Sequence, residues 1–185
     1  MDVDETLFHT KAKVKVVKNG ETIKELSNQE FNTYLLGPGE SYDFGIFRNA
    51  EFFRKTSEPI VPILKRINRI LHNIEVGKRN SKVILLTARS PFDNKKEFEN
   101  TFKDYGVQID DVEIRTVGER SGTIPIKKQK TVREYLKKGN YKRARMFDDS
   151  QANLEAFLQL KREFPSVDFT AIKVKEDGST ELLPN

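Results

Sequence analysis

The chain has 185 residues, of which 36% are hydrophobic and 33% are charged, so it can form one folded domain with a small appendage but not two full domains. It contains no cysteine, which excludes disulfides, thiolate nucleophiles and cysteine-bound zinc, and no apolar run approaches the roughly 18 residues of a membrane-spanning helix. The first residues lack the pattern of a secretion signal, so we expect a cytoplasmic protein, and a net charge of +5 favours anionic partners unless it reflects only a solvated lysine-rich face.

The segment after the N-terminal residues predicts a β-hairpin followed by an irregular flap. Residues 12–17 (AKVKVV) alternate small or apolar side chains with Lys, Asn19 and the next Gly supply a tight turn, and residues 21–26 (ETIKEL) form the return strand. Residues 28–57 are rich in aromatic side chains and are interrupted by Gly-Pro-Gly, which breaks regular structure. We therefore expect a small cap inserted at about residues 11–57.

The next segments predict two helices separated by a buried strand. Apolar residues recur at three- and four-residue spacing between Pro59 and Ile74, which is typical of an amphipathic helix. Residues 82–87 (KVILLT) form a short apolar run of the kind that a strand buried on both faces needs. Asp93 then begins an amphipathic helix that we expect to end at Gly106.

The remainder of the chain alternates strands with helices. In the order strand, helix, strand, helix, strand, the segments are residues 112–117, 127–138, 144–147, 151–162 and 167–174. This alternation implies right-handed βαβ units and a mostly parallel sheet covered by helices. We therefore predict a single α/β domain, a Rossmann-like three-layer sandwich, in which ligands bind beyond the carboxyl ends of the strands.

Polar groups suited to phosphate or metal binding stand at the predicted strand ends. In chain order they are Asp2, Asp4, Thr87, Lys130, Asp148 and Asp149. A phosphomonoester dianion approaches a carboxylate nucleophile only when its charge is neutralised, so the set requires a hard cation and hydrogen-bond donors. Mg²⁺ is suited because it takes oxygen ligands from carboxylates, water and phosphate.

Two of these aspartates are the expected catalytic groups. Asp2 would attack phosphorus in line and form an aspartyl phosphate, which splits hydrolysis into two steps. Asp4 would protonate the leaving alkoxide and then deprotonate the attacking water.

Other groups are expected to bind phosphate or metal. The Thr87 hydroxyl would bind phosphate oxygens, and Arg89 is a further candidate for substrate binding, although an arginine in such a loop is also commonly an exposed salt-bridge partner. Asp148 and Asp149 would complete the metal site. Asp and Ser at this place also cap helices, and the two roles are compatible.

One lysine is expected to neutralise the phosphate and the crowded carboxylates. Lys127, Lys128 and Lys130 are close together at the beginning of a predicted helix. We prefer Lys130, because it stands just ahead of the apolar positions Val132 and Leu136.

These motifs resemble the haloacid-dehalogenase-like phosphatase superfamily. The resemblance covers DVDET at the start, Thr87 in LLTAR, a lysine in KKQK and Asp148-Asp149 in FDDS. It implies the fold, the Mg²⁺ requirement and metal ligation by Asp2 and the Asp4 backbone carbonyl. DVDETLFHT is similar to the DLDETLVH of the protein phosphatases in this superfamily, whereas LTAR is closer to phage-type polynucleotide kinase phosphatases.

The resemblance also raises an expectation about the first strand. Members of the superfamily have a buried central strand immediately before the nucleophile, whereas here only Met1 precedes Asp2. We therefore expect this strand to be short or missing and the natural polypeptide to start further upstream. The alternative is a truncated form that is weakened or inactive.

The substrate is expected to be a nucleotide or polynucleotide phosphate, because the chain is basic and a short cap resembles those of members that act on macromolecules. Small phosphometabolites and phosphoproteins are the alternatives within the enzyme class. A receiver-like phosphoacceptor and a non-catalytic phosphate-binding module are the alternatives outside it. No membrane or obligate protein partner is expected.

Further side chains near the cap have two interpretations. Some aromatic residues would stack on bases or else pack the flap, namely Tyr34, Tyr42, Phe44, Phe47, Phe52 and Phe53. His9, close to the first motif, is a candidate for substrate contact.

Overall fold

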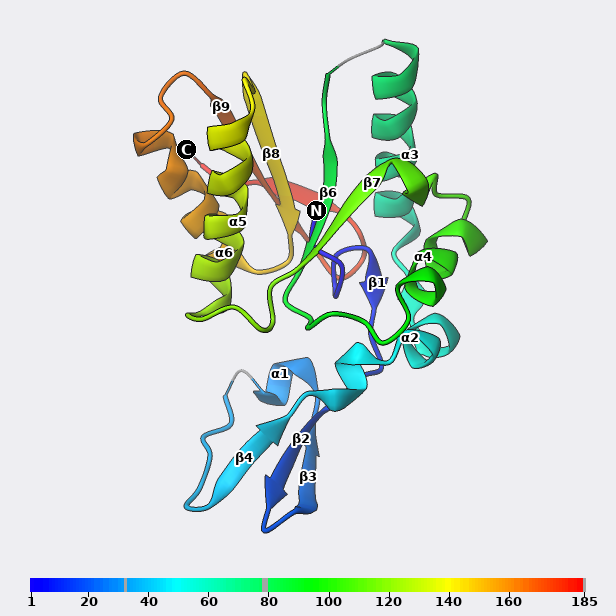
Figure 1. Ribbon diagram of the computed structural model, residues 1–185, viewed down its shortest axis with the longest axis vertical. Helices are drawn as coiled ribbons and strands as arrows, with labels where there is room; N and C mark the ends of the chain where they lie inside the picture. Colours follow the sequence, from blue (N-terminus) through cyan, green and yellow to red (C-terminus); the bar gives the residue numbers. More distant parts are fainter. Residues whose placement is uncertain (32, 78–79, 185) are drawn as a thin grey trace.

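The computed structural model describes residues 1–31, 33–77 and 80–184, which form an α/β body and a small cap (Figure 1). The cap contains β2 (Val14–Lys18), β3 (Glu21–Leu26), α1 (Asn28–Phe31) and β4 (Glu40–Asp43). The body contains β1 (Phe8–His9), α2 (Ala50–Thr56), β5 (Glu58–Pro59), α3 (Val61–Val76), β6 (Val83–Thr87), α4 (Lys95–Asp104), β7 (Val112–Thr116), α5 (Ile124–Lys138), β8 (Arg143–Asp148), α6 (Gln151–Leu158), β9 (Asp168–Val174) and β10 (Thr180–Leu182). Short 3₁₀ helices are η1 (Gly45–Arg48), η2 (Ile109–Asp111) and η3 (Gln159–Arg162).

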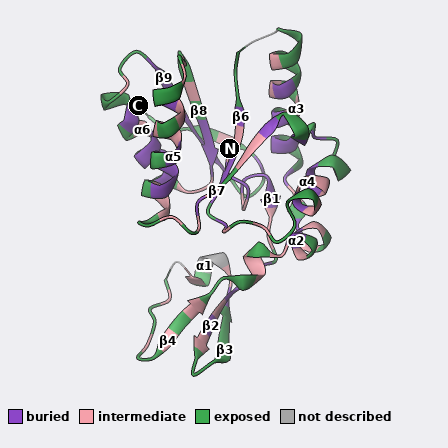
Figure 2. Cartoon of the chain, in the orientation of Figure 1, coloured by how far each residue is buried: buried purple, intermediate pink, exposed green. Residues whose placement is uncertain are grey.

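The body is built on two parallel strand pairs. β6 pairs with β7 and β8 pairs with β9, while β10 adds to β9 in antiparallel orientation. One apolar cluster packs residues of both strand pairs against α3 and α4, and another packs β8 and β9 against α5 and α6 (Figure 2). Phe147 enters the first cluster and Met146 the second, because successive side chains of a strand point to opposite faces. The expected α/β class with parallel strands is confirmed.

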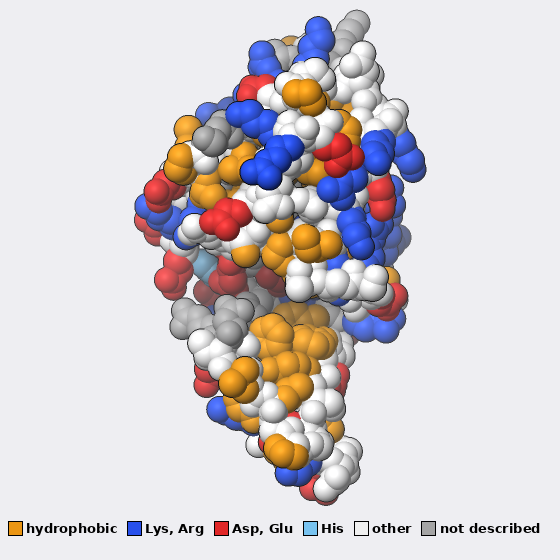
Figure 3. Space-filling view, turned by 90° about the vertical axis from the view of Figure 1, so that its left-hand side faces the viewer, with side chains coloured by type: hydrophobic (Ala, Val, Ile, Leu, Met, Phe, Trp, Pro, Cys, Tyr) orange, Lys and Arg blue, Asp and Glu red, His pale blue; other side chains and the backbone are white. Residues whose placement is uncertain are grey.

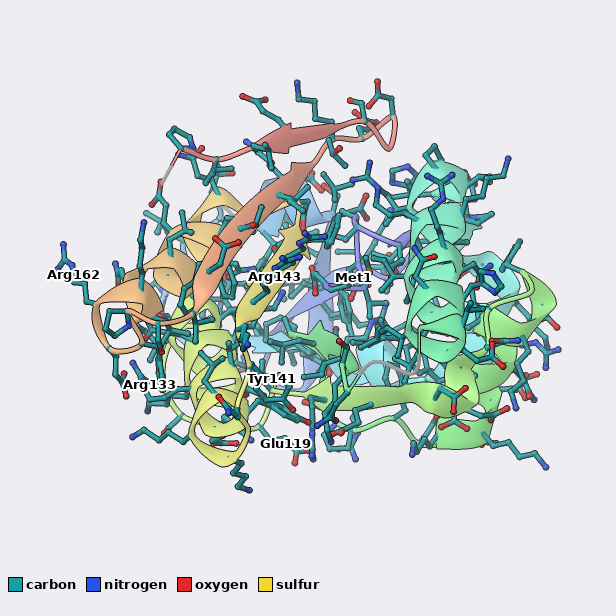
Figure 4. The ribbon with its side chains drawn as sticks, turned by 90° about the horizontal axis from the view of Figure 1, so that it is seen from above. Met1, Glu119, Arg133, Tyr141, Arg143 and Arg162 are labelled. Carbon is teal, nitrogen blue, oxygen red and sulfur yellow. The ribbon has the colours of Figure 1, made fainter. Side chains whose placement is uncertain are left out.

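The N-terminal residues lie between the two parallel pairs. The Met1 ammonium donates to the Ile84 carbonyl at 2.7 Å, and the Met1 carbonyl accepts from the Leu86 N–H at 2.8 Å. The Asp2 N–H donates to the Phe147 carbonyl at 2.9 Å. These three bonds join β6 to β8 through a two-residue segment that forms no named strand itself. Figure 4, seen from the amino ends of the strands, shows Met1 between β8 and α3.

A tight loop follows Asp2 and returns the chain towards the cap. The Val3 carbonyl accepts hydrogen bonds from the N–H groups of Leu7 and Phe8 at 2.8 and 3.1 Å. Glu5 has a φ of 55°, which is uncommon for a residue with a side chain and persists only where the surrounding structure holds it. The loop leads into β1, which pairs with β5 and so brings the two ends of the cap insertion together.

The cap is a three-stranded antiparallel sheet in the order β3-β2-β4. The predicted hairpin is confirmed, and Asn19 and Gly20 have φ values of 53° and 84°, as a tight turn between paired strands requires. The prediction of an irregular flap is wrong for three stretches, because residues 28–31 form α1, residues 40–43 form β4 on the free edge of β2 and residues 50–56 form α2. β4 and α2 depend on tertiary contacts, which a local pattern does not reveal.

The longest helices of the body, α3 and α5, each bury part of their surface. In α3 the side chains of Ile63, Leu64 and Ile67 are buried, as the spacing predicts. Helix α5 begins three residues before the predicted residue 127, with Pro125 in its first turn, where its missing N–H costs no hydrogen bond. Among the described residues no helix is long and apolar enough to cross a membrane.

Candidate active site

Three aspartates converge where the N-terminal segment meets the end of β8. Asp2, Asp148 and Asp149 each offer a carboxylate oxygen, and these oxygens lie within 4.8 Å of one another. The backbone bond from Asp2 to Phe147 explains the meeting, since it sets Asp2 in register beside Asp148. The side chains of Asp2 and Asp148 are almost wholly buried. The structure thus brings together three of the aspartates that the sequence selects.

A buried lysine from α5 links two of these carboxylates. Lys128 is 1% exposed, and its Nζ lies 2.8 Å from Asp2 Oδ1 and 2.8 Å from Asp148 Oδ2. The preferred Lys130 is exposed and lies away from this cluster, so that choice is corrected to Lys128. Helical spacing contained the signal, because Lys128 is four residues before Val132 and eight before Leu136 and shares their face.

The neighbouring Lys127 has a different place. Its Nζ donates to the Gly118 carbonyl at 2.9 Å, so it holds the loop before α5 against that helix. Of the three lysines considered from the sequence, Lys128 alone forms ion pairs with the clustered aspartates in this part of the structure.

The cluster carries more negative charge than its lysine offsets. Burial raises the pKa of Asp2 well above its usual value, and burial together with the charge of Asp148 raises the pKa of Asp149 to about 6. Burial opposes the charge of Lys128, but the carboxylates of Asp2 and Asp148 outweigh it and raise the pKa of that ammonium. Three carboxylates, two of them buried, against one ammonium form a donor set that fits a divalent cation.

Hydrogen bonds fix Asp148 in its orientation. Its Oδ1 accepts from the Ser150 N–H at 3.0 Å and from Asn153 Nδ2 at 2.9 Å, while Oδ2 accepts from Lys128. Ser150 caps α6 through its own side chain, so the expected capping function resides in Ser150 while Asp148 faces the cluster. Asn153 was not selected from the sequence, although its place in the first turn of a helix that follows two aspartates was a usable signal.

Thr6 supports Asp149 from the first motif. The Thr6 hydroxyl is fully buried and accepts from the Asp149 N–H at 3.1 Å. It also lies 3.5 Å from Asp149 Oδ1, which is a long contact. Asp149 is also the least buried of the three aspartates, so its oxygens are the most available of the cluster.

Asp4 lies outside the three-aspartate group and faces Arg89. Arg89 Nε lies 3.1 and 3.0 Å from the two Asp4 carboxylate oxygens, and Nη2 lies 2.6 Å from Oδ1. The Thr87 hydroxyl is 3.4 Å from Asp4 Oδ2 and accepts from the Arg89 N–H at 3.2 Å. Asp4 is close enough to Asp2 for its charge to contribute to the raised pKa of Asp2.

Arg89 and Thr87, two of the residues that the sequence selects for phosphate binding, both contact Asp4. Arg89 is 3% exposed, so it is neither an exposed salt-bridge partner nor presented to a phosphate in this conformation. Thr87 is fully buried at the end of β6, next to Asp4. Both residues therefore lie at the site, but their side chains are directed towards Asp4.

His9 and Glu5 form a pair near the first motif. His9 Nδ1 lies 2.8 Å from Glu5 Oε2, and both side chains are about 30% exposed. Figure 3 shows acidic side chains gathered in the hollow between the body and the cap, with a histidine at its edge. The site is thus acidic, partly covered by the cap and open on one side.

Comparison with protein-family models, with curated proteins and with solved structures gives no match for this chain. The argument for function therefore depends on the geometry and chemistry of the site.

Proposed function

We propose that the chain is a Mg²⁺-dependent phosphomonoester hydrolase that forms an aspartyl phosphate on Asp2. The observation that carries the proposal is the position of Lys128, whose Nζ lies 2.8 Å from both Asp2 and Asp148 in a cluster of three carboxylates. A buried ammonium beside a candidate nucleophile attracts a dianionic phosphate that the carboxylates alone would repel.

Asp2 acts as the nucleophile in the first step. Its carboxylate oxygen bonds to phosphorus while the bond from phosphorus to the leaving oxygen breaks. Lys128 holds one Asp2 oxygen at 2.8 Å and so fixes the carboxylate for an in-line approach. Asp148, tied by Ser150 and Asn153, keeps Lys128 in place.

Asp4 transfers protons in both steps. It gives a proton to the leaving alkoxide and then takes one from the water whose oxygen attacks phosphorus, which frees Asp2 and inorganic phosphate. Its position two residues after Asp2 and 3.4 Å from the Thr87 hydroxyl supports this role. The Thr87 hydroxyl and loop N–H groups are the proposed donors to phosphate oxygens.

Asp2, Asp148 and Asp149 would hold Mg²⁺, together with the backbone carbonyl of Asp4. The ion supplies neutralisation of the phosphate charge and an oxygen-binding template. The negative excess of the cluster and the raised pKa values of Asp2 and Asp149 support such a cation.

The proposal includes a Rossmann-like, haloacid-dehalogenase-like assignment of the fold. It is supported by the parallel pairs β6–β7 and β8–β9, by the Met1–Asp2 segment that joins them, and by helices on both sides. It is also supported by the location of the polar residues at the carboxyl ends of β6 and β8, on the side of the body that faces the cap (Figure 1).

The proposed substrate is a nucleotide or a polynucleotide end. Aromatic rings extend from the Arg89–Asp4 pair to the cap surface, with Phe47 5.1 Å from the Arg89 guanidinium, Phe44 6.3 Å from Phe47, and Phe31 5.5 Å from Phe44. Phe44 is 44% exposed, and Figure 3 shows apolar side chains on the cap face below the hollow. Such rings stack on bases, and the net charge of +5 favours polyanions.

Phosphate release from p-nitrophenyl phosphate tests the activity. We expect release with Mg²⁺, none with EDTA, and none from Asp2→Asn. The matched control is Asp168→Asn, which removes an exposed carboxylate at the start of β9 and should keep full activity. Activity that survives EDTA or the Asp2 substitution contradicts the mechanism, and a complete absence of release favours a non-catalytic module.

A substrate panel tests the substrate class. We expect 3′-phosphorylated oligonucleotides or 5′-mononucleotides to have higher kcat/KM than sugar phosphates or phosphopeptides. Phe44→Ala should raise KM for the nucleic-acid substrates and leave KM for sugar phosphates unchanged. Leu182→Ala, another exposed apolar side chain but on β10, is the control. A preference for sugar phosphates or phosphopeptides would overturn this part of the proposal.

A further inference from the structure

The guanidinium of Arg89 bonds three separate segments of the chain. Nε and Nη2 donate to Asp4, Nη2 also lies 3.1 Å from Thr10 Oγ1, and Nη1 donates to the Phe47 carbonyl at 2.8 Å. Four of its five N–H groups can be satisfied in this way. The side chain is 2% exposed, so these bonds are made out of contact with water.

Aromatic rings hold the guanidinium in this orientation. Its central carbon lies 4.6 Å from the ring centre of Phe53, 5.1 Å from that of Phe47 and 5.8 Å from that of Phe92. A planar guanidinium both stacks on such rings and presents its donors in a fixed fork, which an ammonium cannot do. The position is therefore built for arginine in particular.

Two of the bonded groups belong to the connections between cap and body. Thr10 precedes β2, where the chain enters the cap, and its hydroxyl also accepts from the Ala12 N–H at 3.2 Å. Phe47 lies in η1, where the chain leaves the cap. Arg89 thus contacts both connections and the proposed proton-transfer residue Asp4 with one rigid group.

A second tie holds only the exit connection. The Asp93 N–H donates to the Arg48 carbonyl at 3.0 Å, and Asp93 Oδ1 accepts from the Ala50 N–H at 3.0 Å. None of the bonds that Asp93 forms reaches Asp4 in the described residues. The two ties therefore differ in one respect, which is contact with Asp4.

We propose that Arg89 is a positioning residue that couples the placement of the cap to the orientation of the Asp4 carboxylate. The catalytic consequence of this coupling rests on the proposed function, in which Asp4 is the proton-transfer group. Displacement of either cap connection breaks bonds of the same guanidinium that holds Asp4. Asp4 and the cap therefore change position together, and a substrate that enters under the cap acts on both.

This role replaces the expectation that Arg89 binds phosphate. In the present arrangement its donors face a carboxylate, a hydroxyl and a carbonyl, and aromatic rings cover its faces. A phosphate ligand would require these bonds to be given up first.

Hydrogen exchange of the cap connections tests the coupling without any use of activity. The measured segments are residues 10–13 and 44–50 of the whole protein. Asp4→Asn should speed exchange at 44–50 by about tenfold, because a charge-assisted bond that orients Arg89 is lost. Thr10→Val should speed exchange at the same distant segment, and Thr10→Ser, which keeps the hydroxyl, should not.

The decisive comparison is made in an Arg89→Lys background. Lysine lacks the planar set of donors that arginine has, so in this background Asp4→Asn and Thr10→Val should no longer change hydrogen exchange at residues 44–50. Asp93→Ala should speed exchange at 44–50 in both backgrounds and so shows that the assay reports the exit connection. Unchanged exchange at 44–50 in Asp4→Asn, or equal effects of Asp4→Asn in the wild-type and Arg89→Lys backgrounds, overturns the coupling. Near-ultraviolet circular dichroism confirms that each variant is folded.

Kinetics supply the second readout. With p-nitrophenyl phosphate, Thr10→Val should lower kcat by several-fold and leave KM unchanged, and Thr10→Ser should restore kcat. A changed KM with an unchanged kcat contradicts a role in orienting Asp4. If the wild-type protein releases no phosphate, the proposed function fails, and the exchange experiment still decides whether Arg89 couples the cap to Asp4.

Discussion

Replacement of Lys128 by Met removes the cation that two buried carboxylates share. Lys128 Nζ lies 2.8 Å from Asp2 and 2.8 Å from Asp148, and the lysine is 1% exposed. Breaking a buried ion pair by removal of one partner typically costs about 3–5 kcal/mol, because the remaining charge stays buried without compensation. We expect a loss of that size at pH 7.5 in EDTA.

The matched control is Lys130→Met, two residues further along the same helix. Lys130 is exposed, and surface changes away from special features usually alter stability by less than about 0.5 kcal/mol. For a protein of this size, 1 kcal/mol corresponds to about 2–4 °C in Tm, so Lys128→Met should melt about 6–20 °C lower than the control. Urea unfolding at constant m gives the free energies.

The stability loss caused by Lys128→Met should be smaller in acid, and the direction of this change follows from the raised pKa values of the carboxylates. Burial raises the folded-state pKa of Asp2 and of Asp149, the latter to about 6, so the folded protein binds protons more readily than the unfolded chain below that pH. The unfolding free energy of Lys128→Met should therefore increase as the pH falls from about 7 to about 5. Equal stability of the two variants at pH 7.5, or no recovery in acid, would refute the account of the cluster.

Three further predictions concern the same region. Mg²⁺ at about 100 times its Kd should raise the unfolding free energy of the wild type by about 2.7 kcal/mol and leave Asp149→Asn unaffected; calorimetry with and without EDTA decides this. Gly118→Ala should destabilise the protein by about 1–3 kcal/mol, because an added Cβ would lie 2.6 Å from the Ser90 backbone nitrogen and 2.8 Å from the Ala88 carbonyl oxygen; an unchanged Tm would contradict this packing. Burial lowers the pKa of the Met1 ammonium to about 6 from 8.0, so the contribution of this group to the unfolding free energy should fall as the pH drops from about 8 to about 6, opposite in sign to the contribution of the buried aspartates. N-terminal acetylation, which keeps an N–H for the Ile84 carbonyl, should remove the Met1 contribution, and an unchanged pH dependence in the acetylated protein would contradict it.

Local signals in the sequence predicted the elements that depend on local physics. The Asn19-Gly20 pair predicted the β2–β3 hairpin because both residues accept positive φ. The spacing of apolar residues predicted α3, and the run VILLT predicted β6. In each case the pattern and the tertiary structure agree, so the local evidence sufficed.

The predictions from the sequence failed where the structure depends on the relation between residues that are not adjacent in the chain. The stretch ESYD has no strong strand pattern and becomes β4 only because β2 offers a free edge. Lys128 was missed because Lys130 was chosen for standing just ahead of Val132 and Leu136, whereas in a helix Lys128, four residues before Val132 and eight before Leu136, shares their face. Sequence proximity, used in place of helical spacing, selected the wrong lysine.

Arg89 illustrates a limit of motif reasoning. A loop arginine after a strand is ordinarily exposed, and no local feature indicates that Phe47, Phe53 and Phe92 surround it. Phe92 is three residues after Arg89, but Phe47 and Phe53 precede Arg89 by 42 and 36 residues, so only the fold brings all three rings together. The aspartates were predicted because they follow the strands directly, which is a property of the chain order itself.

The central claim is that Asp2 becomes phosphorylated during turnover, and acid quenching tests it directly. The protein is mixed with a phosphomonoester and Mg²⁺, quenched within milliseconds to seconds, reduced with borohydride and digested for mass spectrometry. The account predicts that modification occurs on the peptide that contains Asp2, and that it is absent with EDTA and in Asp2→Asn. Modification of a different residue, or phosphate release by Asp2→Asn at the wild-type rate, would contradict it.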